Sequence, residues 1–551
     1  MPVRVSPPLR PQPEPPAPPE DASRAQRVRL LKRILPTLTS AVIAAAYVII
    51  SPRSEDLAAH LLRAKLFATQ GFGIWSNWWY AGHNVPGYSV LFPPVAALFT
   101  PQLVAAISAT VTAALFESLA YRRFGEDSWL GALWFGVATS TSLFTGRLTF
   151  AFGLMPAVGA ALALQRRRNG TAVVLAFVTP LASPVGGLFS ALAGGAQAVG
   201  AYLPERRIRP ALPGAGVVIA SAVPVLALAV AFPEGGTEPF AFSAFWPIVV
   251  IAIAMLFVIP NGDITLKAGI ALYALGCIGF YVVASPVGSN VTRLAPLVAG
   301  PLAALLWWPR PSRRLALLVA VALPLLYLQW QAPVRDIRIA DDNGEVTAAY
   351  FQPLVSYLSR QDDRPFRIEI PFTLFHWEAY LIAPEFPLAR GWERQLDIKY
   401  NPLFYGGTLT ASRYDAWLHQ VAVRYVAVSD KNLDYSAKQE VALINRGLPY
   451  LRLVLRTRHW RVYAVRDPAP IVQGTATLTE LGSDSLEVQG LRQGDALVRV
   501  HYSPYWAVVQ GSGCVGPAGD YTELVVRRPG PMKIAMHFSL DRIGAHSLRC
   551  S

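Results

Sequence analysis

Long apolar segments recur at short intervals through the N-terminal part of this 551-residue chain, and they limit what it can fold into. A helix crosses the hydrocarbon core of a bilayer with about 20 mostly apolar residues. Segments near this length lie at 34–50, 95–121, 128–145, 148–164, 171–203, 211–231, 241–260, 268–284, 294–308 and 314–331. The chain is 53% hydrophobic and only 15% charged, which excludes an ordinary soluble enzyme. We therefore expect a mainly helical, multi-pass protein of the cell membrane, with membrane lipids around it.

Basic residues gather in short clusters between these apolar segments. The clusters contain Arg122 and Arg123; Arg166, Arg167 and Arg168; Arg206, Arg207 and Arg209; and Arg310, Arg313 and Arg314. Such clusters are typical of cytoplasmic loops under the positive-inside rule, and they account for much of the net charge of +14. A nucleic-acid site needs basic residues on one contiguous face, so we expect no nucleic acid as a partner.

The order of these clusters predicts the topology. The basic residues of 24–33 precede the first span and put the N-terminus in the cytoplasm. The stretch 171–203 has a basic cluster on either side, so it must cross an even number of times, and Pro180 and Pro184 interrupt it. Counting it as two gives about eleven spans, with the N-terminus inside and the C-terminal part outside. The outer face then carries Glu234, Glu238 and Arg293.

Composition divides the chain into four regions. Residues 1–33 have nine prolines in their first 22 positions and are expected to form a disordered cytoplasmic tail. Residues 34–334 form the transmembrane bundle, with a first outer loop at 51–94. Residues 335–467 have no segment long enough to span a membrane, and they are expected to form an extracytoplasmic α/β domain. Residues 468–551 carry only strand candidates and are expected to form a small extracytoplasmic β-sandwich.

The candidate elements of the two outer domains are short. In the α/β domain we expect strands at 366–370, 423–428 and 460–465, and helices at 411–421 and 436–446. In the sandwich we expect strands at 475–481, 485–491, 497–502, 522–528 and 532–538. The last two strands lie on either side of a Pro-Gly-Pro turn at 529–531.

The three cysteines bear on the compartment of the C-terminal region. Cys277 lies inside an apolar segment, whereas Cys514 and Cys550 lie near the C-terminus. No C-x-x-C spacing occurs, so the cysteines do not predict a metal site. Outside the cytoplasm Cys514 and Cys550 can pair as a disulfide; two unpaired thiols are the alternative.

The first outer loop carries the candidate catalytic residues, Glu55 and Asp56, which follow the first span directly. If Ser54 caps a helix here, then Asp56, His60 and Arg63 lie on one polar stripe of an amphipathic helix at the membrane interface. A carboxylate in this position can act as a general base toward an acceptor hydroxyl. The alternative is that the two acids only end the span and favour the N-terminus of the helix.

An aromatic cluster follows in the same loop. It contains Trp75, Trp78, Trp79 and Tyr80. Aromatic belts are common at the membrane interface, and stacking on a sugar or an isoprenoid is the sharper interpretation for Trp78 and Trp79. His83 comes next in A-G-H-N-V-P-G-Y, where it is either a polar residue of a binding site or a residue of the loop.

Two arginines at the outer mouth of the bundle are not explained by the positive-inside rule. Arg293 lies in S-P-V-G-S-N-V-T-R-L, and Arg147 lies in T-G-R-L-T-F. Arginine binds a phosphate or pyrophosphate with two parallel hydrogen bonds. A structural ion pair, or a side chain that reaches the lipid headgroups, is the alternative for both.

Several familiar chemistries have no support in this sequence. There is no Walker loop, no G-x-G-x-x-G after a strand, no H-E-x-x-H and no G-x-S-x-G. Asp56 and His60 are spaced for a divalent metal, but two ligands without a third leave that site unsupported. We expect no resident cofactor.

These features together resemble the GT-C superfamily of polytopic membrane glycosyltransferases: a first span, an outer acidic pair, an interfacial helix, about ten further spans and an outer C-terminal domain. More narrowly, the motif E-D-L-A-A-H, the stretch W-x-x-W-W-Y-A-G-H and the following P-G-Y resemble bacterial membrane proteins named 6-pyruvoyl-tetrahydropterin-synthase-related. The stretches T-P-L-A-S-P-V-G-G-L-F and V-G-S-N-V-T-R-L are similar to that family as well. The name implies no pterin chemistry.

The resemblance implies transfer of a sugar from a polyprenyl-phosphate donor to a cell-envelope glycan, lipid or protein on the outer face. In the superfamily an acidic residue of the first outer loop acts as base, which corresponds to Asp56 or Glu55, and a cation that binds the donor phosphate corresponds to Arg293. The alternative is a membrane protein without enzymatic activity, either a translocator of lipid-linked glycans or an envelope assembly factor. An ion-coupled translocator is disfavoured because the spans contain almost no acidic residue apart from Glu117.

Overall fold

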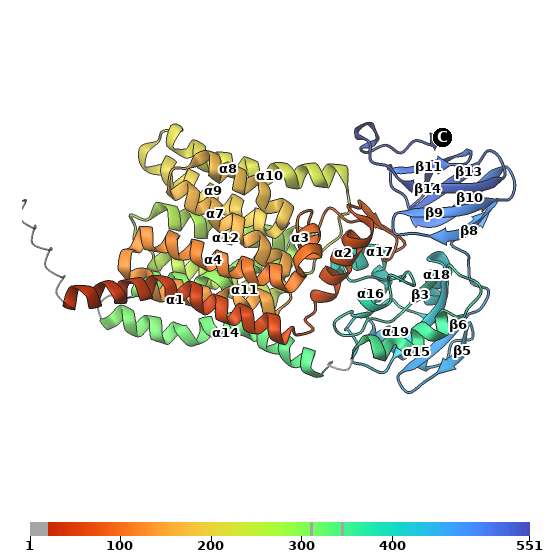
Figure 1. The fold of residues 1–551 in the computed structure, drawn as a ribbon, viewed down its shortest axis with the longest axis horizontal. Coiled ribbons are helices and arrows are strands. Elements are labelled where there is room, and N and C mark those ends of the chain that lie inside the picture. The colour runs from red at the N-terminus through yellow and green to blue at the C-terminus, as the bar shows by residue number, and fades with distance from the viewer. Residues whose placement is uncertain (1–19, 309–311, 343–345, 551) are drawn as a thin grey trace, which may run out of the picture.

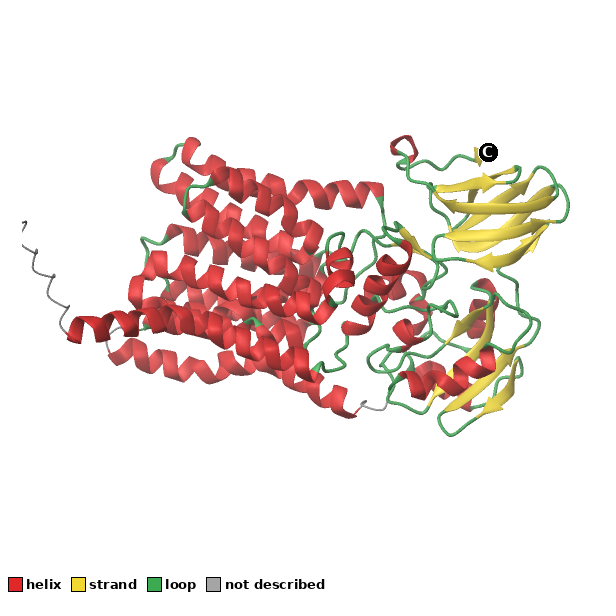
Figure 2. Ribbon diagram, viewed as in Figure 1, coloured by secondary structure: helices red, strands yellow, loops and turns green. Residues whose placement is uncertain are grey.

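The computed structural model of the protein describes residues 20–308, 312–342 and 346–550. The N-terminal part is a bundle of long helices, and two smaller lobes sit together at one end of that bundle (Figure 1). Nearly all of the strands lie in these two lobes (Figure 2). The expectation of a mainly helical fold with a β-rich C-terminal region is confirmed.

Helix covers each apolar segment that the sequence singles out. The bundle consists of α1 (Glu20–Ile50), α4 (Pro101–Phe124), α5 (Trp129–Ala138), α6 (Ser140–Phe144), α7 (Leu148–Gln165), α8 (Asn169–Ala182), α9 (Pro184–Glu205), α10 (Leu212–Ala231), α11 (Phe242–Val258), α12 (Ile264–Val282), α13 (Leu294–Trp307) and α14 (Ser312–Asp342). The stretch 171–203 forms the two helices α8 and α9. Ser183 separates them and caps α9, because its hydroxyl accepts a hydrogen bond from the backbone N–H of Gly186.

Six helical stretches of the described chain are long and apolar enough to cross a membrane: Gln26–Ile50, Pro101–Phe144, Leu148–Gln165, Arg209–Ala231, Ile264–Val282 and Leu315–Asp341. Asn169–Ala182 and Phe242–Val258 are apolar but shorter. These helices are compatible with a membrane protein. The count of eleven crossings and the direction of insertion stay predictions.

The first helix starts earlier than the sequence predicts. Residues 1–19 lie outside the described chain, but α1 begins at Glu20, so the expected disordered tail does not extend to residue 33. After Pro19 the next proline is Pro36, and nothing between them interrupts a helix. Arg33 Nε also donates to Glu117 Oε1 of α4 over 3.0 Å, which fixes this basic turn of α1 against the bundle.

The helix ends that carry basic clusters lie together. Arg123, at the end of α4, forms an ion pair with Asp263, the residue before α12. Gln165, at the end of α7, donates from Nε2 to the carbonyl of Leu119 in α4. The N-terminal part of α1 is at the same end through Arg33 and Glu117. This end of the bundle is the one farthest from the C-terminal lobes (Figure 1).

Small residues let the helices approach closely. A Cβ at Gly136 of α5 would lie 2.4 Å from the carbonyl oxygen of Pro36 in α1. The backbones of α9 and α10 meet in the same way, since a Cβ at Gly214 would lie 2.3 Å from the carbonyl oxygen of Gly194. These contacts pack backbone against backbone, so there is no flexible side chain that can give way.

The first lobe is the expected α/β domain. It contains α15 (Ala348–Leu358), β3 (Arg367–Glu369), α16 (Glu378–Leu381), α17 (Arg394–Tyr400), α18 (Ala411–Gln420), β4 (Val423–Ser429), α19 (Lys438–Asn445), β5 (Leu451–Arg456) and β6 (Trp460–Val465). The sheet order is β3-β4-β6-β5, with β3 parallel to β4 and the other pairs antiparallel. The expected elements correspond to β3, β4, β6, α18 and α19. The edge strand β5 lacks a buried face and was not predicted.

The second lobe is a sandwich of two antiparallel sheets. Its strands are β7 (Val472–Gly474), β8 (Ala476–Leu481), β9 (Ser485–Gly490), β10 (Gly494–His501), β11 (Trp506–Gln510), β12 (Gly513–Ala518), β13 (Tyr521–Val526), β14 (Gly530–Met536) and β15 (Arg549–Cys550). The sheets have the orders β15-β12-β13-β10-β7 and β11-β14-β9-β8. The disulfide Cys514–Cys550 joins β12 to β15, whereas Cys277 is a free, buried thiol in α12.

Substitution of Gly136 by Ala is expected to destabilise the protein by about 1–3 kcal/mol, because the added methyl group overlaps the backbone of Pro36. Thermal unfolding of the purified protein in detergent measures this. Gly276→Ala in α12 is the matched control, since a Cβ there has no atom within 4 Å. Equal unfolding temperatures for the two variants would mean that α1 is not packed on α5 as described.

Candidate functional site

The first outer loop lies at the junction between the bundle and the two lobes (Figure 1). It contains the helices α2 (Leu57–Gln70) and α3 (Phe92–Phe99) and the short strand pair β1 (Trp75–Ser76) and β2 (His83–Asn84). The helix α2 contacts α3 and α4 on the bundle side and α16 in the α/β domain. The loop therefore connects both halves of the protein.

The polar stripe of α2 faces the interior. Asp56 occupies the N-cap position of α2 without a capping hydrogen bond, and the hydroxyl of Ser54 has no partner among the described residues. The expected cap at Ser54 is therefore wrong. His60 is 1% exposed and its Nε2 lies 3.1 Å from the carbonyl oxygen of Gly146. Burial, and then the charge of Arg63, lowers the pKa of His60 to about 3, so its ring is neutral at pH 7.

Arg63 holds the loop to the α/β domain. Its guanidinium forms a buried ion pair with Glu393, and it lies 3.9 Å from the ring centre of Tyr88. The backbone carbonyl of Glu393 accepts a hydrogen bond of 2.8 Å from the hydroxyl of Tyr80. Burial raises the pKa of Glu393, and the positive charge of Arg63 opposes that rise. One side of α2 is thus fixed by charge as well as by packing.

The turn at Gly146 brings Asp56 next to the start of α7. Its φ is +75°, and a Cβ at this position would lie 2.5 Å from Ser54 Oγ and 3.1 Å from the backbone nitrogen of Asp56. Only glycine fits both the dihedral angle and the close approach. Arg147 follows directly and begins α7. The tight turn therefore places Arg147 near Glu55 and Asp56.

Asp56 lies between two arginines. Burial raises the pKa of its carboxyl, and the charges of Arg293 and Arg147, in that order, act against this rise. Arg293 ends the short 3-10 helix Gly288–Arg293 in front of α13, whereas Arg147 lies directly before α7. The structure brings the three residues together, although they are far apart in the sequence.

Neither arginine has a conventional partner. Among the described residues no salt bridge or hydrogen bond involves the guanidinium of Arg147 or Arg293, and Arg293 Nε is buried without a partner. Burial, followed by the charge of Arg147, lowers the pKa of Arg293 to about 10, so it still carries its charge at pH 7. Asp336 and Glu238 add negative charge near the two arginines, so the charges here are balanced. We refer to the group formed by Asp56, Arg147 and Arg293 as the recess.

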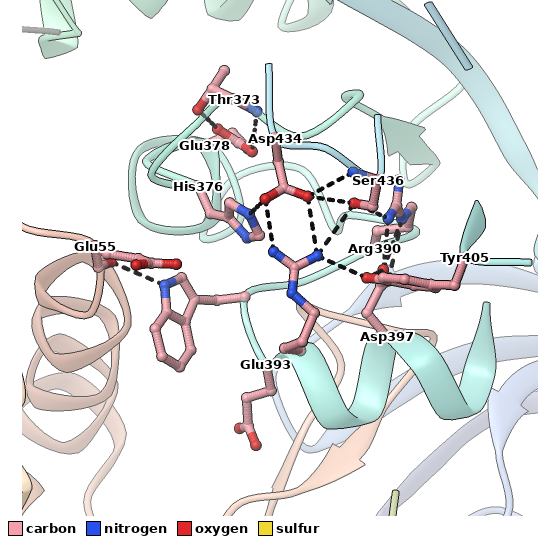
Figure 3. Close-up of polar contacts among 12 residues, drawn as sticks. Glu55, Thr373, His376, Glu378, Arg390, Glu393, Asp397, Tyr405, Asp434 and Ser436 are labelled. Atoms are coloured by element: carbon pink, nitrogen blue, oxygen red, sulfur yellow. Dashed lines mark hydrogen bonds and ion pairs between the residues drawn. The ribbon is translucent and has the colours of Figure 1, made fainter. Parts of the chain in front are cut away.

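The carboxyl of Glu55 has different surroundings from the carboxyl of Asp56. Its backbone carbonyl accepts a hydrogen bond of 3.0 Å from the indole of Trp392, and its carboxyl faces the α/β domain (Figure 3). Burial raises the pKa of Glu55 to about 7, and the charges of Asp56 and Asp336 add to the rise. Its carboxyl is thus partly protonated at neutral pH. Asp56 is the better placed of the two acids to face the arginines.

The aromatic residues of the loop contact the α/β domain. Trp78 and Trp79 are 9% and 1% exposed, and the indole of Trp79 donates to the carbonyl of Ala379 over 3.2 Å. The ring of His83 stacks on Trp79 with 5.6 Å between ring centres. These residues pack the loop against the α/β domain, and they do not contact Asp56.

A buried ionic cluster that was not predicted from the sequence supports the loop. Arg390 pairs with Asp397 over 2.6 Å, and Arg394 pairs with Asp434 over 2.8 Å (Figure 3). Arg390 also pairs with Glu440 over 3.3 Å. The two arginines flank Trp392 and Glu393, the residues that contact the loop. His376 and Glu378 are also buried in this domain, and Glu378 accepts hydrogen bonds from Thr373. Asp434 and Glu440 lie 40 and 50 residues from their arginines, and Asp397 lies seven residues from Arg390 in another element, so no local pattern reveals the cluster.

Comparisons with known proteins identify no relative. No protein-family model matches the chain, and no curated protein has significant similarity to it. Among the described residues no group of three or more His, Cys, Asp or Glu side chains is arranged to hold a metal ion. Function must therefore be argued from the recess itself.

Substitution of Glu393 by Gln is expected to destabilise the junction by about 3–5 kcal/mol, because it leaves the buried charge of Arg63 without its partner. Thermal unfolding and limited proteolysis of the first outer loop measure the effect. Glu480→Gln, an exposed change in β8, is the control. The double variant Arg63→Met with Glu393→Leu should recover part of the loss, and a wild-type protease pattern for Glu393→Gln would contradict the role of the pair.

Proposed function

We propose that this protein is a membrane-embedded glycosyltransferase of the GT-C type, which uses a polyprenyl-phosphate sugar as donor and modifies a glycan, lipid or protein of the cell envelope. The observation that carries this proposal is the recess at the outer mouth. There Asp56 faces Arg147 and Arg293, and neither guanidinium has a partner among the described residues. Arginines that lack a hydrogen-bond partner and lie near the carboxylate of Asp56 suit a phosphate ligand next to a base.

The proposed topology places this recess outside the cytoplasm. The basic helix ends lie together at the end of the bundle farthest from the lobes, which is the arrangement that the positive-inside rule requires of a cytoplasmic face. The recess and both lobes then belong to the extracytoplasmic side. The disulfide Cys514–Cys550 fits this assignment, since disulfides persist in oxidising compartments.

The proposed chemistry needs a base and a stabilised leaving group. Asp56 accepts the proton of the acceptor hydroxyl, whose oxygen attacks the anomeric carbon of the donor sugar. The bond between that carbon and the phosphate oxygen breaks, and the electron pair leaves with the polyprenyl phosphate. Arg147 and Arg293 bind the phosphate and stabilise the charge it gains. The neutral ring of His60 adds no competing charge to the recess.

Replacement of Asp56 by Asn is expected to lower the transfer rate by about 10²–10⁴-fold, because the amide cannot take the proton. The assay uses purified protein, radiolabelled polyprenyl-phosphate sugars and cell-envelope acceptors. Asp127→Asn, an exposed change at the other end of the bundle, is the control. Normal glycan output from Asp56→Asn, with normal membrane insertion, would remove Asp56 from the mechanism and favour an assembly factor.

Replacement of Arg147 by Gln is expected to change both donor binding and the pH profile. The rate should fall as the pH drops through the pKa of Asp56, because the base must be ionised to accept a proton. The charge of Arg147 lowers that pKa, so its removal should move the acidic limb of the profile to higher pH and raise KM for the donor. Arg209→Gln, in a basic cluster at the far end, should change neither quantity. If the Arg147→Gln variant has the same acidic limb and the same KM for the donor as the wild type, then Arg147 is not part of the site.

A further inference from the structure

A second feature of the first outer loop is a groove beside the C-terminal half of α2. Its walls come from α2, from the loop segment 71–94 and from the β8–β9 turn of the sandwich. It is a shallow groove, open to solvent, with a cavity volume of about 60 Å³. We call it the loop groove and define it by the following lining residues: Arg63, Gln70, Phe72, Trp75, Trp79 and Asp484.

The walls of the loop groove are fastened to one another. The hydroxyl of Ser483 in the β8–β9 turn donates to the side-chain oxygen of Gln70 at the end of α2. Asn77 donates from Nδ2 to the carbonyl of Gly482 over 2.9 Å, and its backbone N–H donates to the carbonyl of Ser483 over 2.7 Å. The sandwich therefore forms a fixed wall of the groove and is not a loosely tethered lobe.

Polar groups without partners line the loop groove. Arg63 is 6% exposed, and its Nη1 is buried with no hydrogen-bond partner among the described residues, although its Nη2 pairs with Glu393. The carboxylate of Asp484 takes part in no hydrogen bond or salt bridge of the described chain. One buried donor and one acceptor thus remain available to a ligand.

Aromatic rings accompany these polar groups. Phe72 is 60% exposed at the groove, whereas Trp75 and Trp79 line it but are only 4% and 1% exposed. The exposed ring of Phe72 offers a flat apolar surface that a sugar ring can cover with its C–H face. Neighbouring hydroxyls of the same sugar can then pair with a donor and an acceptor on the walls.

We propose that the loop groove binds a neutral saccharide, the acceptor of the proposed transfer. A phosphate or another anion is disfavoured, because Glu393 already balances the charge of Arg63 and Asp484 adds a negative charge. A lipid chain is disfavoured, because hydrocarbon would leave Arg63 Nη1 buried without a partner. The hydroxyls of a saccharide can accept a hydrogen bond from Arg63 Nη1 and donate one to the carboxylate of Asp484. The acceptor role rests on the proposed function, whereas saccharide binding itself does not.

The loop groove and the Asp56 recess lie on either side of Tyr88. Arg63 lies 3.9 Å from the centre of the Tyr88 ring, and the ring of His60 lies 5.9 Å from it. Along α2, seven residues separate Arg63 from Asp56, which is about 10 Å of helix. The ring of Tyr88 and about 10 Å of helix therefore separate the groove from Asp56.

Direct binding tests the proposal without any transfer reaction. Full-length protein in detergent is titrated with a panel of labelled, neutral oligosaccharides of hexoses and pentoses. We expect at least one to bind, and we expect Asp484→Ala and Phe72→Ala each to weaken it about tenfold, as the loss of one wall contact predicts. Asp495→Ala is the matched control, because Asp495 lies at the opposite end of β9 from the β8–β9 turn.

Two results would overturn the proposal. One is that no oligosaccharide of the panel binds the folded wild-type protein, or that both groove variants bind as the wild type does. The other is that Asp484→Ala weakens binding of sugar-free polyprenyl phosphate, which would assign the groove to the lipid. Asp56→Asn separates this proposal from the proposed function: it should bind saccharide normally without transfer. If Asp56→Asn transfers normally and Asp484→Ala no longer binds saccharide, then Asp56 is not the base, but the loop groove is still a saccharide site.

Discussion

The buried ion pair between Arg63 and Glu393 determines where the first outer loop lies, and the candidate site depends on that loop. A guanidinium and a carboxylate removed from water are tolerated only while they remain paired. The pair holds α2 between the bundle and the α/β domain. With α2 in place, Asp56 at its start faces the two arginines and Arg63 further along faces the loop groove. The pair between Arg63 and Glu393 thus sets the position of Asp56 at the start of α2 and of the groove further along the helix.

The Asp56 recess shows how the surrounding structure gives common side chains distinct properties. Glu55 and Asp56 are neighbours, yet burial against the α/β domain raises the pKa of Glu55 to about 7, while two arginines oppose the rise at Asp56. Gly146 makes this possible, since only its lack of a side chain lets the turn before α7 approach the loop. Differences in environment therefore separate two adjacent acids into a candidate base and a residue of the domain interface.

The sequence predicts what depends on local pattern. Apolar segments located the bundle helices, and short runs of strand-forming residues located β4, β6, β8 and β9, because each pattern lies within one element. The partner of Arg63 could not be predicted, since it lies 330 residues away and nothing near either residue marks the contact. The cap at Ser54 and the tail to residue 33 were wrong for a related reason: contacts with Gly146 and Glu117 decide those positions.

The long separation between Arg63 and Glu393 also has a consequence for biosynthesis. Chains emerge from the ribosome N-terminus first, so α2 is made well before the segment that completes its packing. Until the α/β domain has been made and folded, the charge of Arg63 must stay hydrated or find a temporary partner. The bundle can thus insert helix by helix, but the recess reaches its final form only when the last third of the chain arrives. Maturation of the site is coupled to completion of synthesis.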